Sequence, residues 1–178
     1  MNCDVVVDSA SDDTPKNLNT LRTIIDSVKT DFCKGNRTVL SLKKDDCRRT
    51  SIDEVAEALK DLPNLKVFQL QDVALFPSRS ALAQTLRSDS LRQLSLSGRG
   101  IWQKAVISAL GDGSFLPCLT DLSLTGIALE LIPAGFTSLT ALETLDLCDN
   151  CIKSFDSEYD SLLSDCCWQN LKVFVPVN

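Results

Sequence analysis

Apolar residues recur along this chain in an eleven-residue frame, at positions one, four, six and usually eleven. The clearest stretch runs from Leu142 to Ile152 and reads LxxLxLxxNxI. Side chains alternate across a strand with period two, so positions four and six point to one face while positions three, five and seven point to the other. Each frame therefore predicts one short strand with a single buried face.

The frame fits five times, with starts at 37, 65, 91, 119 and 142, and a sixth start falls at Leu171. The intervals between starts range from 23 to 29 residues. One such unit cannot bury its apolar face alone, so neighbouring units are expected to stack into a parallel sheet. The predicted strands lie near 38–43, 66–71, 92–97, 120–125, 143–148 and 172–175.

The segments that connect these strands carry helix signals. Ser51 and Glu54 have the spacing of a capping box, and apolar residues follow at helical intervals as far as Leu59. Apolar stripes of the same kind predict helices over 78–87 and 102–110. The fourth connection, 131–139, contains Pro133 and Gly135, which favour an irregular turn.

This pattern resembles the leucine-rich repeat family, and the longer intervals resemble its ribonuclease-inhibitor-like subclass, with one shorter repeat near residue 130. The resemblance implies an α/β solenoid with a curved parallel sheet on its concave side and helices and irregular turns on its convex side. Solenoids of this kind mostly bind other proteins. We therefore expect a protein-protein interaction module in which residues 37–178 form five to six repeats.

Residues 1–36 lie outside the repeat frame and are expected to form an N-terminal helical cap. Pro15 suits the first helical turn, and Gly35 suits the end of the helix. Between them runs an apolar stripe at helical spacing, made of Leu18, Leu21, Ile24, Ile25, Val28 and Phe32. Such a helix would cover the open core of the first repeat.

The frame also predicts which residues meet a partner, because positions three, five and seven project away from the leucine core. The predicted partner-binding residues are Lys43, Gln69, Gln71, Gln93, Ser95, Ser97, Asp121, Ser123, Thr125, Thr144, Asp146 and, one position further on, Asp149. This face runs from basic at the first repeat to acidic at the last. Loop residues such as Phe76, Arg79 and Arg99 would add further contacts.

Composition and charge indicate a single domain and argue against several classes of partner. The chain has 178 residues, 44% of them hydrophobic, which suffices for one continuous domain. A formal charge of -6 argues against nucleic acid as a partner. No apolar run of about 18 residues is present, so we expect no membrane partner. The start lacks the pattern of a signal peptide, which favours the cytoplasm, where the eight cysteines would be free thiols.

Candidate chemistry is sparse. Cys148, Cys151, Cys166 and Cys167 could hold zinc, but the first two already belong to the best repeat frame, and adjacent cysteines make awkward ligands. We therefore expect no metal and no cofactor. Histidine is absent, and no nucleotide-binding or metalloprotease motif occurs, so we expect no enzyme.

Two alternatives remain open at this point. The repeats also resemble the GTPase-activating proteins for Ran, and Arg99, in the turn after the third strand, would then be the working residue. The chain could instead be a fragment of a longer receptor or scaffold array. Pro176 suits an edge strand, so we expect a monomer or weak association through the C-terminal edge.

The aromatic residues are expected to pack in the core. This expectation covers Phe68, Phe115, Phe136 and Phe155, together with Trp102 and Trp168.

Overall fold

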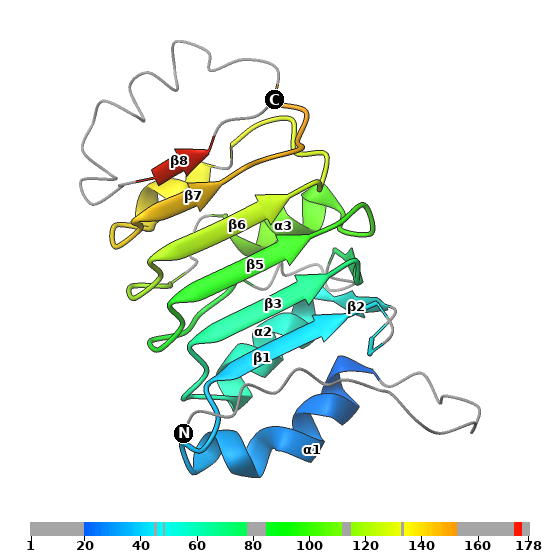
Figure 1. Ribbon diagram of the computed structural model, residues 1–178, viewed down its shortest axis with the longest axis vertical. Helices are drawn as coiled ribbons and strands as arrows, with labels where there is room; N and C mark the ends of the chain where they lie inside the picture. Colours follow the sequence, from blue (N-terminus) through cyan, green and yellow to red (C-terminus); the bar gives the residue numbers. More distant parts are fainter. Residues whose placement is uncertain are drawn as a thin grey trace.

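A computed structural model describes residues 20–44, 46–47, 49–77, 85–111, 115–132, 134–152 and 173–175. Its main element is a parallel sheet whose strands lie side by side in chain order (Figure 1). The strands are β1 (Val39–Lys43), β3 (Val67–Gln71), β5 (Gln93–Ser97), β6 (Asp121–Thr125), β7 (Thr144–Asp146) and β8 (Val173–Val175). All six coincide with predicted strands to within two residues, which confirms the α/β class.

The strands pair in the register that the frame predicts. Position four of each repeat stands beside position four of the next, as in Leu94 beside Leu122, and both side chains are buried. The carbonyl oxygen that precedes each strand accepts two bonds from the next repeat. Thr38 O, for example, accepts from the amides of Lys66 at 2.7 Å and Val67 at 3.0 Å. The same paired acceptance recurs at Lys66, Arg92 and Thr120. The leucine rows are therefore continuous.

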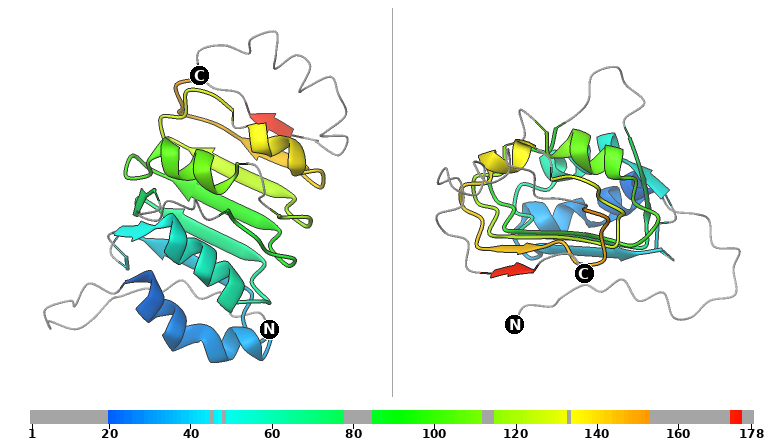
Figure 2. Two further views of the ribbon diagram at one scale, coloured as in Figure 1. Left: turned by 180° about the vertical axis from the view of Figure 1, so that it is seen from behind. Right: turned by 90° about the horizontal axis from the view of Figure 1, so that it is seen from above.

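The helices lie on one face of this sheet, as the view from above shows (Figure 2). Helix α2 (Ile52–Asp61) has the predicted capping box, in which Ser51 Oγ accepts from Glu54 N at 3.3 Å and Glu54 Oε2 from Ser51 N at 3.0 Å. Helix α3 (Gln103–Ala109) confirms the third predicted connection. The fourth contains the 3-10 helix η1 (Ala134–Ser138) in place of an α-helix, also as predicted. Most of the second predicted helix lies outside the described residues.

Helix α1 (Leu21–Cys33) lies beyond β1 and packs against α2 (Figure 1). Its buried residues are Leu21, Ile24, Ile25 and Phe32, all members of the predicted stripe. The expected start near Pro15 is wrong. Thr20 is extended, with φ -72° and ψ 155°, and its side chain accepts from Thr23 N, so the helix begins at Leu21. The division into a cap and repeats stays a prediction.

A second, two-stranded parallel sheet was not predicted. Strands β2 (Arg49–Ser51) and β4 (Ala74–Phe76) form it, and Leu75 makes a further bridge to Ile101. Here the frame supplies a single apolar position, the eleventh, at Leu75 and Ile101 and none within β2, so the alternation is too short to indicate a strand. Thr50, Leu75 and Ile101 are buried, whereas the residues on either side of each are more exposed.

The residue at position eight of each repeat from the second to the fifth turns the chain with a left-handed or related backbone conformation. The φ values are 56° at Asp72, 107° at Gly98, 68° at Gly126 and 57° at Asp149. Glycine and aspartate tolerate positive φ better than most residues. Three of these amides also extend the ladder at 2.8 to 3.0 Å, since Asp72 and Gly98 donate to the last residue of the next strand and Gly126 donates to Cys148, two residues beyond β7.

Strand β7 ends at Asp146, two residues before the predicted end. Asp146 Oδ1 accepts from the amide of Cys148 at 3.0 Å, which closes a side-chain turn at this point. An aspartate at position five of the frame therefore shortened the strand, an effect that the leucine pattern does not carry.

Asn150 ties the fifth repeat to the fourth. Its side chain is 7% exposed, and its Oδ1 accepts from the amides of Ile127 at 3.2 Å and Leu129 at 3.0 Å. Its Nδ2 donates to the carbonyl oxygens of Leu124 and Leu147. Ala128, whose φ is 55°, lies between these two hydrogen-bonded amides. Asn150 thus holds a left-handed alanine, which costs about 1–2 kcal/mol on its own.

Replacing Asn150 with alanine is expected to lower the free energy of unfolding by about 2–4 kcal/mol, because buried backbone groups lose their partners. Urea denaturation followed by circular dichroism measures this change. Asn36→Ala is the matched control, since Asn36 is exposed, and a loss below about 0.5 kcal/mol is expected there. Equal losses for the two variants would contradict the role given to Asn150.

Gly98→Ala is expected to destabilise the protein by more than Gly126→Ala. At Gly98, φ is 107° and an added Cβ would lie 2.9 Å from the Asp72 Cα, whereas at Gly126 nothing lies within 4 Å. The left-handed conformation at Gly126 costs about 1–2 kcal/mol for alanine, and the contact with the Asp72 backbone adds to this at Gly98. Thermal unfolding of both variants tests the order. A higher melting temperature for Gly98→Ala than for Gly126→Ala would refute it.

Candidate functional site

The candidate site is the face of the sheet opposite the helices, here called the bare face (Figure 2). In-register pairing arranges its side chains in three rows that cross the strands. The rows contain Gln93, Asp121 and Thr144; then Gln69, Ser95, Ser123 and Asp146; then Lys43, Gln71, Ser97 and Thr125. The structure thus brings eleven of the predicted residues onto one surface.

The side chains in these rows are polar or charged and partly or largely exposed, and some are held by hydrogen bonds. The hydroxyls of Ser123 and Thr125 lie 3.0 Å apart. Thr120 Oγ1 donates to Asp121 Oδ2 at 2.7 Å, which orients that carboxylate. The middle of the bare face therefore offers hydroxyl and amide groups.

Charge is distributed unevenly over the bare face. Lys43 and Lys44 are exposed at the end of β1, whereas Asp121 and Asp146 lie on β6 and β7. From β1 to β7 there are four strand spacings, or about 19 Å. This exceeds the screening length of about 8 Å at physiological ionic strength, so the two ends act on a partner independently.

Asp149 lies apart from the rows, in the turn that follows β7. Together with Arg99 and Gly126 it lines two adjoining depressions on the side where the strands end. One of them, here called the Trp102 depression, has a volume of about 640 Å³ and is also lined by Trp102 and Lys104. Arg99, the loop residue singled out in the sequence, is exposed at the junction of the two.

The prediction that the aromatic residues pack in the core is right for Phe68 and Phe136, which are fully buried. It is wrong for Trp102 and Phe115, which are 54% and 53% exposed. Trp102 directly precedes α3, and its ring centroid lies 5.6 Å from that of Phe76 on the outer side of the small sheet. Phe155 and Trp168 lie outside the described residues.

The cysteines do not form a chemical centre in the described part of the chain. Cys33, Cys47, Cys118, Cys148 and Cys151 are free, and no group of three or more potential metal ligands occurs among the described residues. Cys166 and Cys167 lie outside them, so the absence of zinc stays a prediction. Burial raises the pKa of the Cys47 thiol. A hydrogen bond to Asp146 raises the pKa of Cys148, which keeps that thiol protonated at neutral pH.

Among the described residues, no helix has both the length and the apolar character needed to cross a membrane. The expected cytoplasmic location stays a prediction.

The chain thus belongs to the α/β class, with an in-register parallel sheet whose helices, within the described residues, lie on one face. It is similar to a leucine-rich-repeat-containing protein, the volume-regulated anion channel subunit LRRC8E of mouse and human. Identity is 32% over 125 residues in both species. The similarity covers 67% of this chain and 15% of each relative's length. No family model matches the chain, and no solved structure matches it.

The Asp146→Asn variant is expected to make Cys148 react faster with iodoacetamide at pH 8. Removing the carboxylate lowers the pKa of the thiol, so more thiolate is present at that pH, and the wild-type rate rises only as the pH climbs above the ordinary thiol range. Mass spectrometry of the labelled peptides measures the rate. Cys33, on α1 at the other end of the sheet, is the internal control, and a Cys148 rate unchanged beside it would contradict the assignment.

Proposed function

We propose that this protein is a leucine-rich repeat solenoid that acts as a non-enzymatic protein-protein interaction module. The observation that carries the proposal is the bare face, on which in-register pairing aligns polar side chains in rows: positions five and seven are polar on every strand of the main sheet from β1 to β6, and position three is polar from β5 to β7. The partner would lie on this face and on the adjacent loops. The basic Lys43 end and the acidic Asp146 end would select a partner whose charges are complementary to both.

Several repeated features support the solenoid. The leucine rows, the paired acceptance of amides before each strand and the positive φ at position eight recur from one repeat to the next. Repetition of one supersecondary unit with contacts mainly between neighbours is the property that defines a solenoid. Helices α2 and α3 favour the ribonuclease-inhibitor-like type for the earlier repeats, and η1 favours one shorter repeat.

The composition of the bare face predicts its strength of binding. Tight interfaces centre on tryptophan, tyrosine or arginine anchors worth about 2 kcal/mol or more each, and the three rows contain none of these. Binding through the bare face should therefore be modest and should weaken as salt screens the two charged ends.

A second candidate, a regulator of a small GTPase, is favoured by one observation. Arg99 is exposed, and it enters none of the ion pairs formed among the described residues, which are Arg22–Glu57, Lys29–Asp61 and Arg37–Asp31. An exposed arginine beside a depression can reach a partner's phosphates. If this candidate holds, Arg99→Ala abolishes stimulation of GTP hydrolysis while the melting temperature stays unchanged.

The test of the main proposal is affinity capture with a charge-reversed bare face. A variant that combines Lys43→Glu, Lys44→Glu and Asp146→Lys is expected to lose a protein that the wild type retains from the native lysate. The reason is that both charged ends would then repel groups that the wild type attracts. Quantitative mass spectrometry of the retained proteins measures the difference.

The matched control carries the same three types of change on the helices. Asp26→Lys, Lys34→Glu and Lys60→Glu alter exposed residues of α1 and α2 or beside them, and produce the same net charge. Circular dichroism confirms that both variants are folded. Retention of the partner by the control and its loss by the bare-face variant would support the proposal. Equal retention by all three proteins would rule out the bare face as the binding surface.

A further inference from the structure

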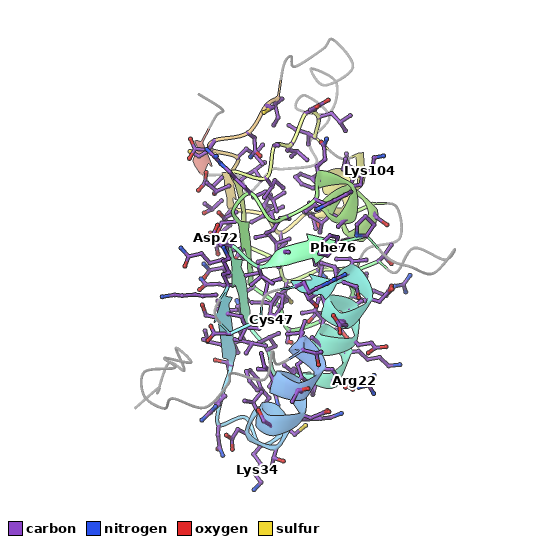
Figure 3. All side chains as sticks on the ribbon, turned by 90° about the vertical axis from the view of Figure 1, so that its right-hand side faces the viewer. Arg22, Lys34, Cys47, Asp72, Phe76 and Lys104 are labelled. Carbon is purple, nitrogen blue, oxygen red and sulfur yellow. The ribbon has the colours of Figure 1, made fainter. Side chains whose placement is uncertain are left out.

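The Trp102 depression lies on the side of the molecule where the strands end, and its lining contains none of the eleven row residues of the bare face. The view onto this side labels Asp72 at the end of β3, Phe76 on β4 and Lys104 on α3 (Figure 3). The turns after β5, β6 and β7 contribute Arg99, Ala128 and Asp149 to the lining. A volume of about 640 Å³ lies within the range of about 300–1,000 Å³ that is usual for ligand sites. It suits a few side chains of a partner rather than a folded domain.

Two cations line this depression. Arg99 and Lys104 are both exposed, and neither takes part in an ion pair within the described residues. An anionic group placed here would gain charge-assisted bonds from both. Asp149 lines the same depression, so the local charge is one net positive, which matches one carboxylate rather than a chain of phosphates.

An aromatic anchor stands beside the two cations. The Trp102 side chain is 54% exposed, yet its ring contacts Phe76 at 5.6 Å between centroids. Phe76 in turn lies 5.0 Å from the guanidinium carbon of Arg49. This stack restricts the indole before a partner arrives, so less conformational entropy is lost on binding. Exposed tryptophans with an apolar neighbour are frequent centres of binding energy.

Part of the depression is also fixed. Ala128 lines it and has a φ of 55°, held by the two hydrogen bonds from neighbouring amides to Asn150 Oδ1. Backbone strain of this kind persists only where the surrounding structure enforces it, and it is concentrated at binding sites. The depression thus combines two cations that form no ion pair with the described residues, a restrained indole and a fixed apolar residue.

We propose that the Trp102 depression binds a short extended peptide segment of a partner protein, in which an acidic residue adjoins a large apolar residue. The carboxylate lies between Arg99 and Lys104, and the apolar side chain lies against Trp102 and Ala128. The inference rests on the proposed interaction function and adds to it a second binding surface with its own specificity. A single-stranded nucleic acid is disfavoured because Asp149, and Asp72 in the adjoining depression, would repel its phosphates.

The experiment selects binders from a displayed library of random dodecapeptides on the immobilised wild-type protein. Acidic residues next to leucine, phenylalanine or tryptophan are expected to be enriched. The selected peptides are then titrated by fluorescence anisotropy. Trp102→Ala and the double variant Arg99→Ala with Lys104→Ala are each expected to weaken their binding about tenfold or more, the effect typical of an anchor residue.

Each variant has a matched control elsewhere on the surface. Arg92 and Lys66 are exposed and precede β5 and β3, at the opposite ends of the strands from Arg99. Replacing both with alanine removes two positive charges, as the Arg99 and Lys104 double variant does. Phe115→Ala removes an equally exposed aromatic ring. Both controls are expected to bind the peptides within about twofold of wild type, and circular dichroism shows whether each variant is folded.

Three results would overturn the inference. The first is enrichment of peptides without acidic residues, and the second is equal binding by the depression variants and their controls. The third is tighter binding of a labelled twelve-residue oligothymidylate than of the peptides, lost in the Arg99 and Lys104 variant, which would assign the depression to nucleic acid. The bare-face variant separates the two proposals. If the bare-face variant loses the native partner while Trp102→Ala binds the peptides as tightly as wild type, the interaction function is supported and the peptide site at the Trp102 depression is refuted.

Discussion

The structure depends on one constraint, which is that the leucines of each repeat can be buried only against those of the neighbouring repeats. Leu122 and Leu124 on β6 lie beside Leu94 and Leu96 on β5, and all four side chains are at most 1% exposed. A slip of one residue would turn an entire row of leucines to solvent. The burial of one face therefore sets the register, and the register aligns the polar rows of the bare face.

The turns maintain this register at the point where each strand ends. Position eight adopts positive φ in four successive repeats, and three of its amides continue the ladder into the next repeat. Asn150 performs a related role within the turn from Ile127 to Leu129. The same turns line the Trp102 depression, so the interactions that stabilise the stack also shape this surface. Stability and recognition are linked through them.

The two proposed surfaces differ in their physical character. The bare face is wide and lined by polar side chains. Its basic end at Lys43 and its acidic end at Asp146 are separated by about 19 Å. The Trp102 depression is small and combines an aromatic ring with two cations that form no ion pair within the described part of the chain. The first suits recognition by long-range charge, which mainly governs association rate, and the second suits a few strong contacts, which mainly govern dissociation. A partner that used both would gain specificity from each.

The leucine frame by itself determined the strands, their order, their parallel register and the residues of the bare face, because each follows from local alternation and a fixed repeat. It also indicated α2 through Ser51 and Glu54. Only the tertiary structure decided the pairing of β2 with β4, the early end of β7 and the exposure of Trp102. Those features depend on contacts between residues that lie 20 or more positions apart, or on single side-chain bonds such as that of Asp146. The Trp102 depression likewise joins three successive turns, which no local pattern brings together.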